Sequence, residues 1–168
     1  MSLTIHQDID TLVESKQFLS FILAGDEYAT DILKVQEIRD WTSTTLVPNS
    51  PTYIEGVLNL RGEIIPIINL RTRFGLPDLP DKKNRIVIVL NIVSDQKRRL
   101  MGLLVDAFSE TYDIPLEKIK SAPNNISVID DDFISGLTTV DEKMVILLDV
   151  DELMNSNELS TDCSAATA

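Results

Sequence analysis

The sequence has very little of the residues from which many catalytic and metal centres are built. Its 168 residues include one cysteine, Cys163, and one histidine, His6, and both lie near the ends of the chain. A single cysteine excludes a disulfide within the chain. The central part therefore lacks material for a zinc site, and for a Ser/His or Cys/His nucleophile pair.

Glycine and long apolar runs are also scarce. None of the six glycines has the spacing of a phosphate-binding loop. No apolar run approaches the roughly 20 residues of a membrane span, and the polar, acidic N-terminus does not resemble a signal peptide. These absences predict a reduced, soluble, cytoplasmic protein with no direct membrane insertion.

Positive charge is the third shortage. The chain has 15 Lys and Arg residues against 27 Asp and Glu, a net charge of −12, which disfavours binding to nucleic acid or anionic lipid. The run Asp130–Asp132 lacks the spacing of a calcium loop and predicts a solvated acidic loop, so no metal or cofactor is expected. The basic residues of the central turns are interpreted as solvated loop charges: Lys82, Lys83, Arg85, Lys97, Arg98 and Arg99.

What the sequence does contain is short β-prone segments, rich in apolar and branched residues, between turn signals. The best example, "RIVIVLNIV" from Arg85 to Val93, predicts a strand. Residues 33–38 could instead form one or two helical turns. The first 16 residues are expected to be flexible and residues 156–168 to form a disordered tail. The single tryptophan, Trp41, fits either a surface anchor or the edge of a core.

An internal repeat organises these segments. The stretch "YIEGVLNLRGEIIPIINLRTRF" from Tyr53 aligns without a gap with "FISGLTTVDEKMVILLDVDELM" from Phe133, an offset of 133 − 53 = 80. A fainter match relates Tyr28 to Met101, an offset of 101 − 28 = 73. The repeat predicts two β units, at about residues 17–80 and 85–155, which pack side by side as small barrels or curled sheets. Whether the two units exchange terminal segments is left open.

The two copies differ at the turn of the repeated hairpin. The first has Arg61-Gly62-Glu63 and the second Asp141-Glu142-Lys143, and Pro66 stands opposite Ile146. Folding the hairpin therefore does not require an arginine. Arg61 fits a solvated turn cation, but its planar guanidinium also suits an interface, and its apolar neighbours favour a carboxylate partner. Glu37 and Glu63 are both candidates.

Several motifs together resemble one known family. "DILKVQEIR", "YIEGVLNLRGEIIPIINLRTRFG", "GLLVD" and "MVILLDVDEL" are similar to the CheW family of chemotaxis coupling proteins, over a domain of about 17–155. The resemblance implies a mostly β fold of two five-stranded SH3-like β-barrels with a few short helices, and no catalytic activity. It also implies an adaptor between chemoreceptor cytoplasmic tips and the histidine kinase CheA, recruited to receptor arrays at the inner membrane. With no receiver or kinase module in the sequence, a stand-alone coupling protein, monomeric when isolated, is expected.

The resemblance also assigns site residues. Glu37 and Arg61 match the family's paired charges beside the receptor groove, and Val35 and Gly56 match positions tied to receptor or kinase coupling. The same motif is completed by four further residues: Asn59, Leu60, Gly62 and Pro66. A second, ring-forming kinase contact would use Lys120. Asn125 stands at a neighbouring position of that contact, where some members carry an aromatic residue.

Two other functions fit parts of the sequence. A small-molecule or nucleotide-binding enzyme domain would place convergent polar residues and acids of perturbed pKa in a cleft between the barrels. A coupling protein serving another sensory pathway, such as surface motility, would share the same motifs.

Overall fold

The computed structural model describes residues 14–80, 83–94, 97–121 and 133–154. The acidic run Asp130–Asp132, Asn125 and the predicted tail lie outside these residues. The first strand begins at Ser15, so the predicted flexible N-terminus, placed at residues 1–16, extends two residues too far.

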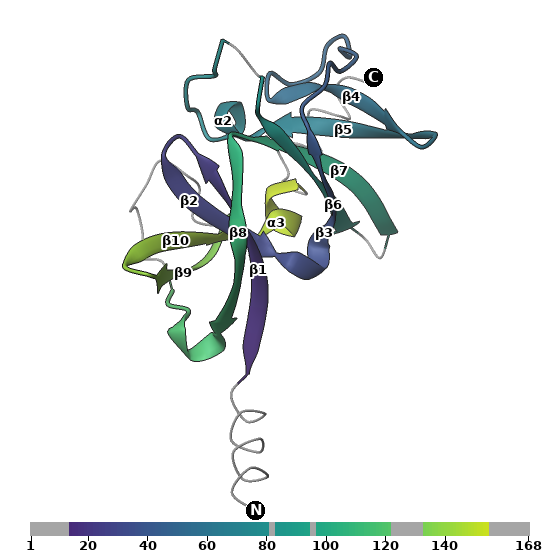
Figure 1. The fold of residues 1–168 in the computed structure, drawn as a ribbon. Helices are drawn as coiled ribbons and strands as arrows, with labels where there is room; N and C mark the ends of the chain where they lie inside the picture. The colour runs from purple at the N-terminus through teal and green to yellow at the C-terminus, as the bar shows by residue number, and fades with distance from the viewer. Residues whose placement is uncertain (1–13, 81–82, 95–96, 122–132, 155–168) are drawn as a thin grey trace, which may run out of the picture.

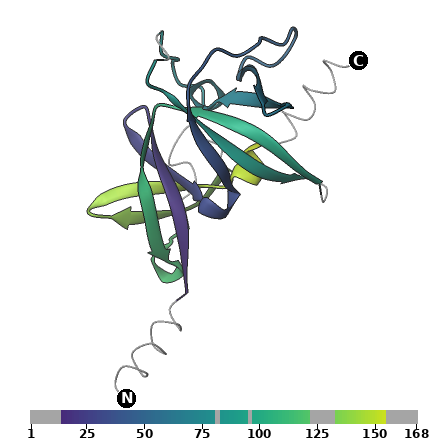
Figure 2. The same ribbon diagram turned by 45° about the vertical axis from the view of Figure 1, so that its right-hand side comes forward.

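In the described residues, ten strands form two five-stranded sheets, which lie side by side in both views of the ribbon (Figures 1 and 2). Each sheet has one parallel pair of strands, and its other pairs are antiparallel. The first sheet has the order β8-β1-β2-β10-β9 and consists of β1 (Ser15–Leu23), β2 (Asp26–Asp31), β8 (Ala107–Pro115), β9 (Ile134–Val140) and β10 (Lys143–Leu148). The second has the order β3-β6-β7-β5-β4 and consists of β3 (Val35–Asp40), β4 (Ile54–Leu60), β5 (Glu63–Asn69), β6 (Ile86–Ser94) and β7 (Lys97–Val105). The short helices are η1 (Ile32–Lys34), α2 (Leu70–Arg73), η2 (Leu116–Lys118) and α3 (Val150–Met154). The expected mostly β fold with two five-stranded units is confirmed.

The two sheets are copies of one another in strand order. If β8, β1, β2, β10 and β9 are replaced by their repeat counterparts, the order β3, β6, β7, β5, β4 results. Even the parallel register is repeated, because Leu147 pairs with Ala29 in the first sheet and Ile67 pairs with Gly102 in the second. The internal repeat read from the sequence is therefore a repeat of structure.

The sheets do not divide the chain at residues 80–85, and the topology shows the exchange of terminal segments that the sequence left open. Residues 80–85 lie between β5 and β6, which belong to the same sheet, and the hairpins β1–β2 and β6–β7 are each paired with strands of the other half. Sequence similarity identifies equivalent strands. It does not say which copy of a hairpin a strand pairs with, because both copies carry the same apolar pattern.

Two local predictions are also corrected. Residues 33 and 34 complete the single 3₁₀ turn η1, and the strand β3 begins directly after them at Val35. The burial of β3 alternates along the strand, as expected for an edge strand with one covered face. Strand β8 was not predicted at all, since its polar sequence "AFSETYDIP" is only weakly strand-like. The strand predicted over Arg85–Val93 is confirmed as β6.

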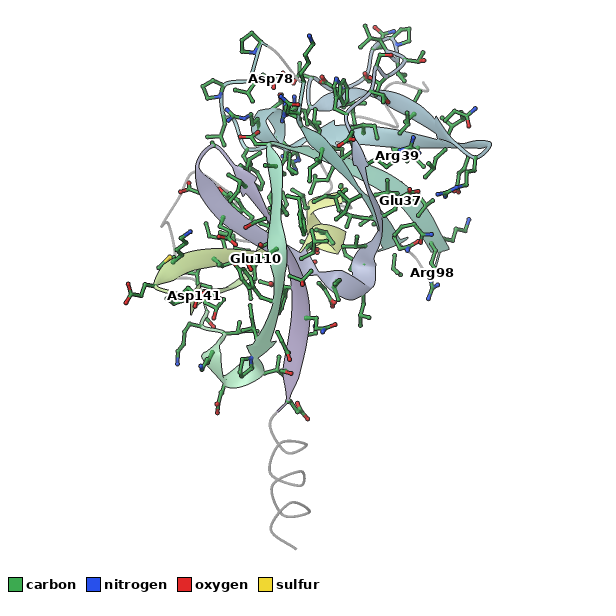
Figure 3. All side chains as sticks on the ribbon, viewed as in Figure 1. Glu37, Arg39, Asp78, Arg98, Glu110 and Asp141 are labelled. Carbon is green, nitrogen blue, oxygen red and sulfur yellow. The ribbon has the colours of Figure 1, made fainter. Side chains whose placement is uncertain are left out.

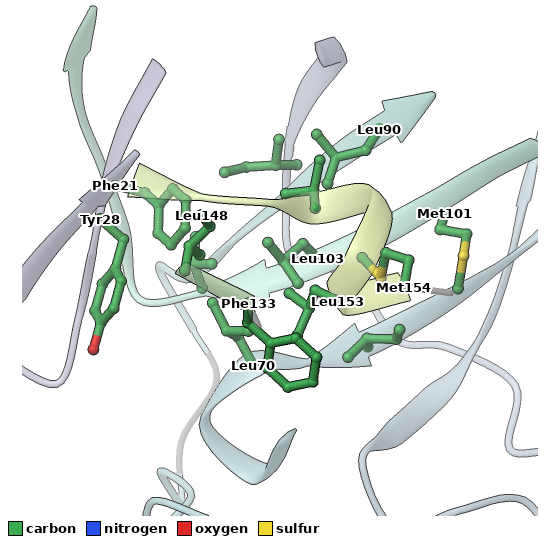
Figure 4. Close-up of a cluster of buried hydrophobic side chains, with 14 of the residues drawn as sticks. Phe21, Tyr28, Leu70, Leu90, Met101, Leu103, Phe133, Leu148, Leu153 and Met154 are labelled. Carbon is green, nitrogen blue, oxygen red and sulfur yellow. The ribbon is translucent and has the colours of Figure 1, made fainter. Parts of the chain in front are cut away.

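Buried side chains form three apolar cores. Each sheet has a small core of its own. That of the first sheet is built around Phe18, Ala29 and Val145, and that of the second around Ile65, Val87 and Leu104. The third and largest joins the sheets, and α3 packs into it against β6 (Figure 4). Successive residues of β6 serve different cores, because side chains of a strand point to alternate faces.

Candidate functional site

The repeated hairpin turn has the same backbone in both copies. Arg61 and Gly62 form a two-residue turn with φ of +50° and +88°, and Asp141 and Glu142 form its counterpart with φ of +51° and +66°. The predicted third turn residue, Glu63, is instead the first residue of β5. Because the non-glycine residue Glu142 adopts the conformation of Gly62, the difference between the two turns lies in their side chains rather than in their fold.

Arg61 is paired with Glu37. The guanidinium Nη2 donates to both carboxylate oxygens of Glu37, at 3.1 and 3.3 Å. Of the two carboxylates that the sequence offered, Glu37 is thus a bonded partner. The Arg61 side chain remains 71% exposed and that of Glu37 25% exposed, so the pair is a surface contact with guanidinium area left for another molecule.

This ion pair connects two outer strands. Glu37 lies on β3 and Arg61 at the end of β4, and these two strands are at opposite ends of the second sheet's order (Figure 3 shows Glu37 on β3). A backbone bridge between Thr45 and Val57 joins the same two regions. The contact therefore helps to bring the sheet's edges together, as in a closing barrel.

The first sheet has no equivalent pair among its described residues. The position of Glu37 is taken by Glu110 and that of Arg61 by Asp141, and two carboxylates repel each other. Glu110 instead accepts a hydrogen bond from the Tyr112 hydroxyl, which also donates to Glu27 at 2.5 Å. Burial and the bond to Glu27 raise the pKa of Tyr112 to about 12, so this hydroxyl remains a donor at neutral pH.

Other predicted residues of the hairpin have structural contacts. The Asn59 side chain accepts from the Gly62 N–H at 2.9 Å, and Leu60 is buried in the second sheet's own core. Gly56 has a φ of +148°, and a Cβ there would lie 2.5 Å from Thr44 Oγ1, so only glycine fits. These contacts shape the hairpin that carries Arg61.

Val35 and Pro66 occupy the ends of ladders. Val35 begins β3 and packs on the shared core. Pro66 pairs with Val57 of β4, and the pairs of β5 with β7 begin only at Ile67, whereas Ile146 in the first sheet is paired with Tyr28. Because proline has no N–H, the parallel ladder begins after it.

Several exposed apolar side chains lie near this pair in sequence. Ile38 is next to Glu37 in sequence, Ile64 follows the hairpin turn, and Leu46 and Val47 follow the bridged Thr45. Trp41 is half-buried against the second sheet's core, which favours the core-edge interpretation. The hairpin that carries the largely exposed Arg61 therefore also carries one exposed apolar side chain, Ile64.

Lys120 is joined to the other sheet by an isolated backbone bridge. Its backbone exchanges two hydrogen bonds with Leu137, the counterpart of the Thr45–Val57 bridge, and its side chain is exposed. Lys120, Leu137 and the exposed Met144 line an open cavity of about 580 Å³. Asn125 cannot be placed beside it, because it is outside the described residues.

Sequence reasoning missed a buried ion-pair network. Asp106 accepts from Arg71 Nε at 2.9 Å and Nη2 at 2.6 Å, and from the Ala24 N–H at 2.9 Å. Arg85, predicted as a solvated charge, is only 2% exposed and lies 3.6 Å from Asp106 and 3.2 Å from Asp78. The quoted motifs "NLR" and "GLLVD" contain Arg71 and Asp106, but nothing in the sequence shows that they meet.

The network sets the protonation of its acid. Burial by itself raises the pKa of Asp106, but the hydrogen bonds from Arg71 and Ala24, with the charges of Arg71 and Arg85, outweigh burial and hold the pKa below its ordinary value. The same contact raises the pKa of Arg71. Asp106 is therefore a carboxylate at neutral pH, as a structural ion pair requires.

The described residues do not favour a ligand-binding enzyme. No group of three or more potential metal ligands occurs among them. The described groups with shifted pKa values are Tyr28, Arg71, Asp106 and Tyr112, and none of these lines the 580 Å³ cavity. None of the helices in the described part of the chain has the length and hydropathy to cross a bilayer.

Comparison with known proteins decides the family. The family model of the CheW-like domain matches residues 17–158. The chain belongs to the CheW family. This is a family of non-catalytic scaffold proteins of chemotaxis.

Individual relatives agree. A chemotaxis protein CheW of Klebsiella aerogenes is 39% identical over 145 residues, which cover 86% of this chain and 85% of the relative. The CheW of Treponema pallidum is 33% identical over 160 residues, 92% of both chains. The scaffolding protein TtCheW of Thermoanaerobacter tengcongensis has a crystal structure that matches with a TM-score of 0.76 and 35% identity, covering 86% of this chain and 90% of that one.

Proposed function

We propose that this CheW-family chain links the cytoplasmic helical tips of chemoreceptors to the regulatory domain of CheA, in arrays at the inner membrane. Receptor binding is assigned to the Arg61 hairpin and the exposed apolar side chains that lie near it in sequence. The observation that supports this assignment is the contrast between the copies, since the Arg61–Glu37 pair is built on a turn whose duplicate folds identically without it.

The proposed mechanism is equilibrium coupling. A protein without chemistry transmits a signal if two partners prefer different states of the complex, and each then biases the binding of the other. The exposed Ile64, next to the hairpin turn, would contact one face of a receptor helix, as in helix-in-groove recognition. Arg61 would set the register of that contact, because an exposed ion pair adds little affinity.

The end of the first sheet is assigned a different partner surface. Lys120 and the adjoining cavity, with Met144 and Leu137, offer a cation beside an apolar floor. We assign this surface to the second, ring-forming contact with the kinase. Its position on the other sheet would allow receptor and kinase to bind at the same time.

The experiment is the substitution Arg61→Ala, assayed for receptor control of kinase autophosphorylation in reconstituted receptor membranes. We expect receptor control to be lost while the free energy of unfolding changes by only about 0–1 kcal/mol. The matched control is Asp141→Ala, at the equivalent turn of the first sheet, which should retain control. Normal receptor control in Arg61→Ala would refute the assignment.

A charge exchange distinguishes two roles of the arginine. If the ion pair only orders the hairpin, Arg61→Glu combined with Glu37→Arg should restore coupling. If Arg61 contacts the receptor itself, the exchanged protein should remain defective. Pull-downs with the receptor tip and with the kinase regulatory domain, separately and together, would show which partner is lost.

A further inference from the structure

The two sheets are held together by the largest apolar core. It contains residues of both sheets and of the helices α2 and α3, such as Leu70, Leu103 and Leu153 (Figure 4). Burial of apolar surface favours contact but has no direction, so it does not by itself fix the angle at which two sheets meet. The angle therefore depends on directional contacts, which are the ion pairs and hydrogen bonds that join the two sheets.

The first such contact, which we name the first clamp, consists of Asp106, Arg71 and Ala24. Asp106 is the single residue between β7 of the second sheet and β8 of the first. Its carboxylate binds Arg71, in the helix that follows β5 of the second sheet, and the Ala24 N–H, in the β1–β2 turn of the first. One side chain at a crossover thus holds both sheets.

The second clamp consists of Lys34, Asp151 and Val93. Lys34 is the last residue before β3, where the chain crosses from the first sheet to the second. Its Nζ lies 2.5 Å from Oδ2 of Asp151, in the helix that follows β10 of the first sheet. The other oxygen of Asp151 accepts from the Val93 N–H in β6 of the second sheet, at 3.2 Å.

The clamps are repeat counterparts with exchanged charges. Arg71 and Asp151 are equivalent under the 80-residue offset, and Lys34 lies within one residue of the equivalent of Asp106 under the 73-residue offset. In the first clamp the crossover residue is the acid and the helix residue is the base, whereas in the second the crossover residue is the base. Each crossover thus carries an ion pair between a crossover residue and a helix residue, although the backbone N–H that the acid also binds is at a different place, Ala24 in one clamp and Val93 in the other.

We propose that these two clamps are the positioning contacts that fix the angle between the sheets. We propose further that the second clamp is the weaker of the two and opens more readily. The side chains of Arg71 and Asp106 are 12% and 16% exposed, and buried Arg85 supports them. Those of Lys34 and Asp151 are 28% and 32% exposed, so solvent and salt weaken their attraction more. The second clamp also borders a cavity of about 320 Å³.

The test compares Lys34→Gln with a matched control, Lys16→Gln. Lys16 forms a similar pair with Asp31, at 3.3 Å, but both residues belong to the first sheet. Spin labels at Thr111→Cys in β8 and Arg98→Cys in β7, in a Cys163→Ser background, report the distance between the sheets by pulsed electron resonance. We expect a broader distance distribution in Lys34→Gln than in wild type, and an unchanged one in Lys16→Gln.

Ionic strength and hydrogen exchange supply independent readouts. About 1 M salt should broaden the wild-type distribution toward that of Lys34→Gln, and should leave Lys34→Gln unaffected. The Val93 amide should exchange about two- to fivefold faster in Lys34→Gln, in line with the small worth of a part-exposed pair, with Ala24 unchanged. Equal distributions in wild type and Lys34→Gln, or equal broadening in both variants, would overturn the proposal. The readouts need neither receptor nor kinase, so they are independent of the proposed function.

Discussion

At the scale of single residues, two arginines show how much position changes the same side chain. Arg61 is mostly exposed and holds Glu37 on the surface, where solvent screens the pair. Arg85 is almost completely buried and shares Asp106 with Arg71. The first is suited to contact with a partner, while the second supports the fold, because a buried charge must be compensated within the protein.

The buried network predicts an acid-dependent stability. Because the pKa of Asp106 is lower in the folded state than in the unfolded chain, its ion pairs stabilise the protein above the ordinary pKa of an aspartate, near 4. This contribution is lost as the pH falls through the lowered folded-state pKa. Asp106→Asn should cost about 3–5 kcal/mol at pH 7, since it leaves Arg71 and Arg85 without their carboxylate.

Urea unfolding of both proteins at pH 7, 5, 4 and 3 measures this effect. The difference in the free energy of unfolding between wild type and Asp106→Asn should be largest at pH 7 and should narrow below pH 4. Comparing the two proteins cancels the contribution of the many other acidic residues. A difference that does not vary with pH would show that the carboxylate charge is not what stabilises this network.

At the scale of elements, the two repeated hairpins separate folding from function. Both use a two-residue turn with positive φ, and both have the same register and the same bulge near Gly56 and Gly136. What the first adds is side-chain chemistry at the turn: Asn59, Arg61 and the pair with Glu37. The second shows what the element needs in order to form.

Asn59→Ala tests whether this added chemistry also stabilises the hairpin. The substitution removes the acceptor of the Gly62 N–H, and we expect a loss of about 0.5–1 kcal/mol in chemical denaturation, as for a single surface hydrogen bond. Thr139→Ala, at the equivalent position of β9, serves as control and should change stability by less than about 0.5 kcal/mol. Equal effects of the two substitutions would mean that the Asn59 bond contributes nothing measurable.

At the scale of the whole molecule, the exchange of hairpins makes the two halves of the chain interdependent. The first sheet takes β1 and β2 from the N-terminal half, and the second takes β6 and β7 from the C-terminal half. Each half alone would lack three strands of one sheet and two of the other, and would expose one side of the shared core. An apolar surface of that kind is not stable in a small monomer.

Fragments 1–80 and 81–168 should therefore not fold separately. Each alone is expected to give the poorly dispersed amide spectrum of an unfolded chain, and an equimolar mixture should recover the spectrum of the intact protein. The cut lies in the polar segment between α2 and β6, so it breaks no strand. A folded, monomeric fragment 1–80 would contradict this account.

The family, the repeat and the Arg61–Glu37 partnership could all be predicted from the sequence. The apolar surroundings of Arg61 predicted a carboxylate partner and left Glu37 and Glu63 open, and the resemblance to the CheW family selected Glu37. Strands β3 and β8 were missed or misjudged because each is a polar edge strand whose conformation comes from pairing with β6 and β1. Arg85 was misjudged because its burial depends on Asp78 and Asp106, which its neighbours in sequence do not reveal.

The sequence by itself determined that the chain is a repeated β protein of the CheW family and that the departure between the copies lies at Arg61. These are properties of apolar pattern and residue type, which are local. The tertiary structure alone decided which hairpin pairs with which half, and that Lys34 and Asp106 meet partners of opposite charge at the two crossovers. Both copies carry the same pattern, so only long-range packing distinguishes these arrangements.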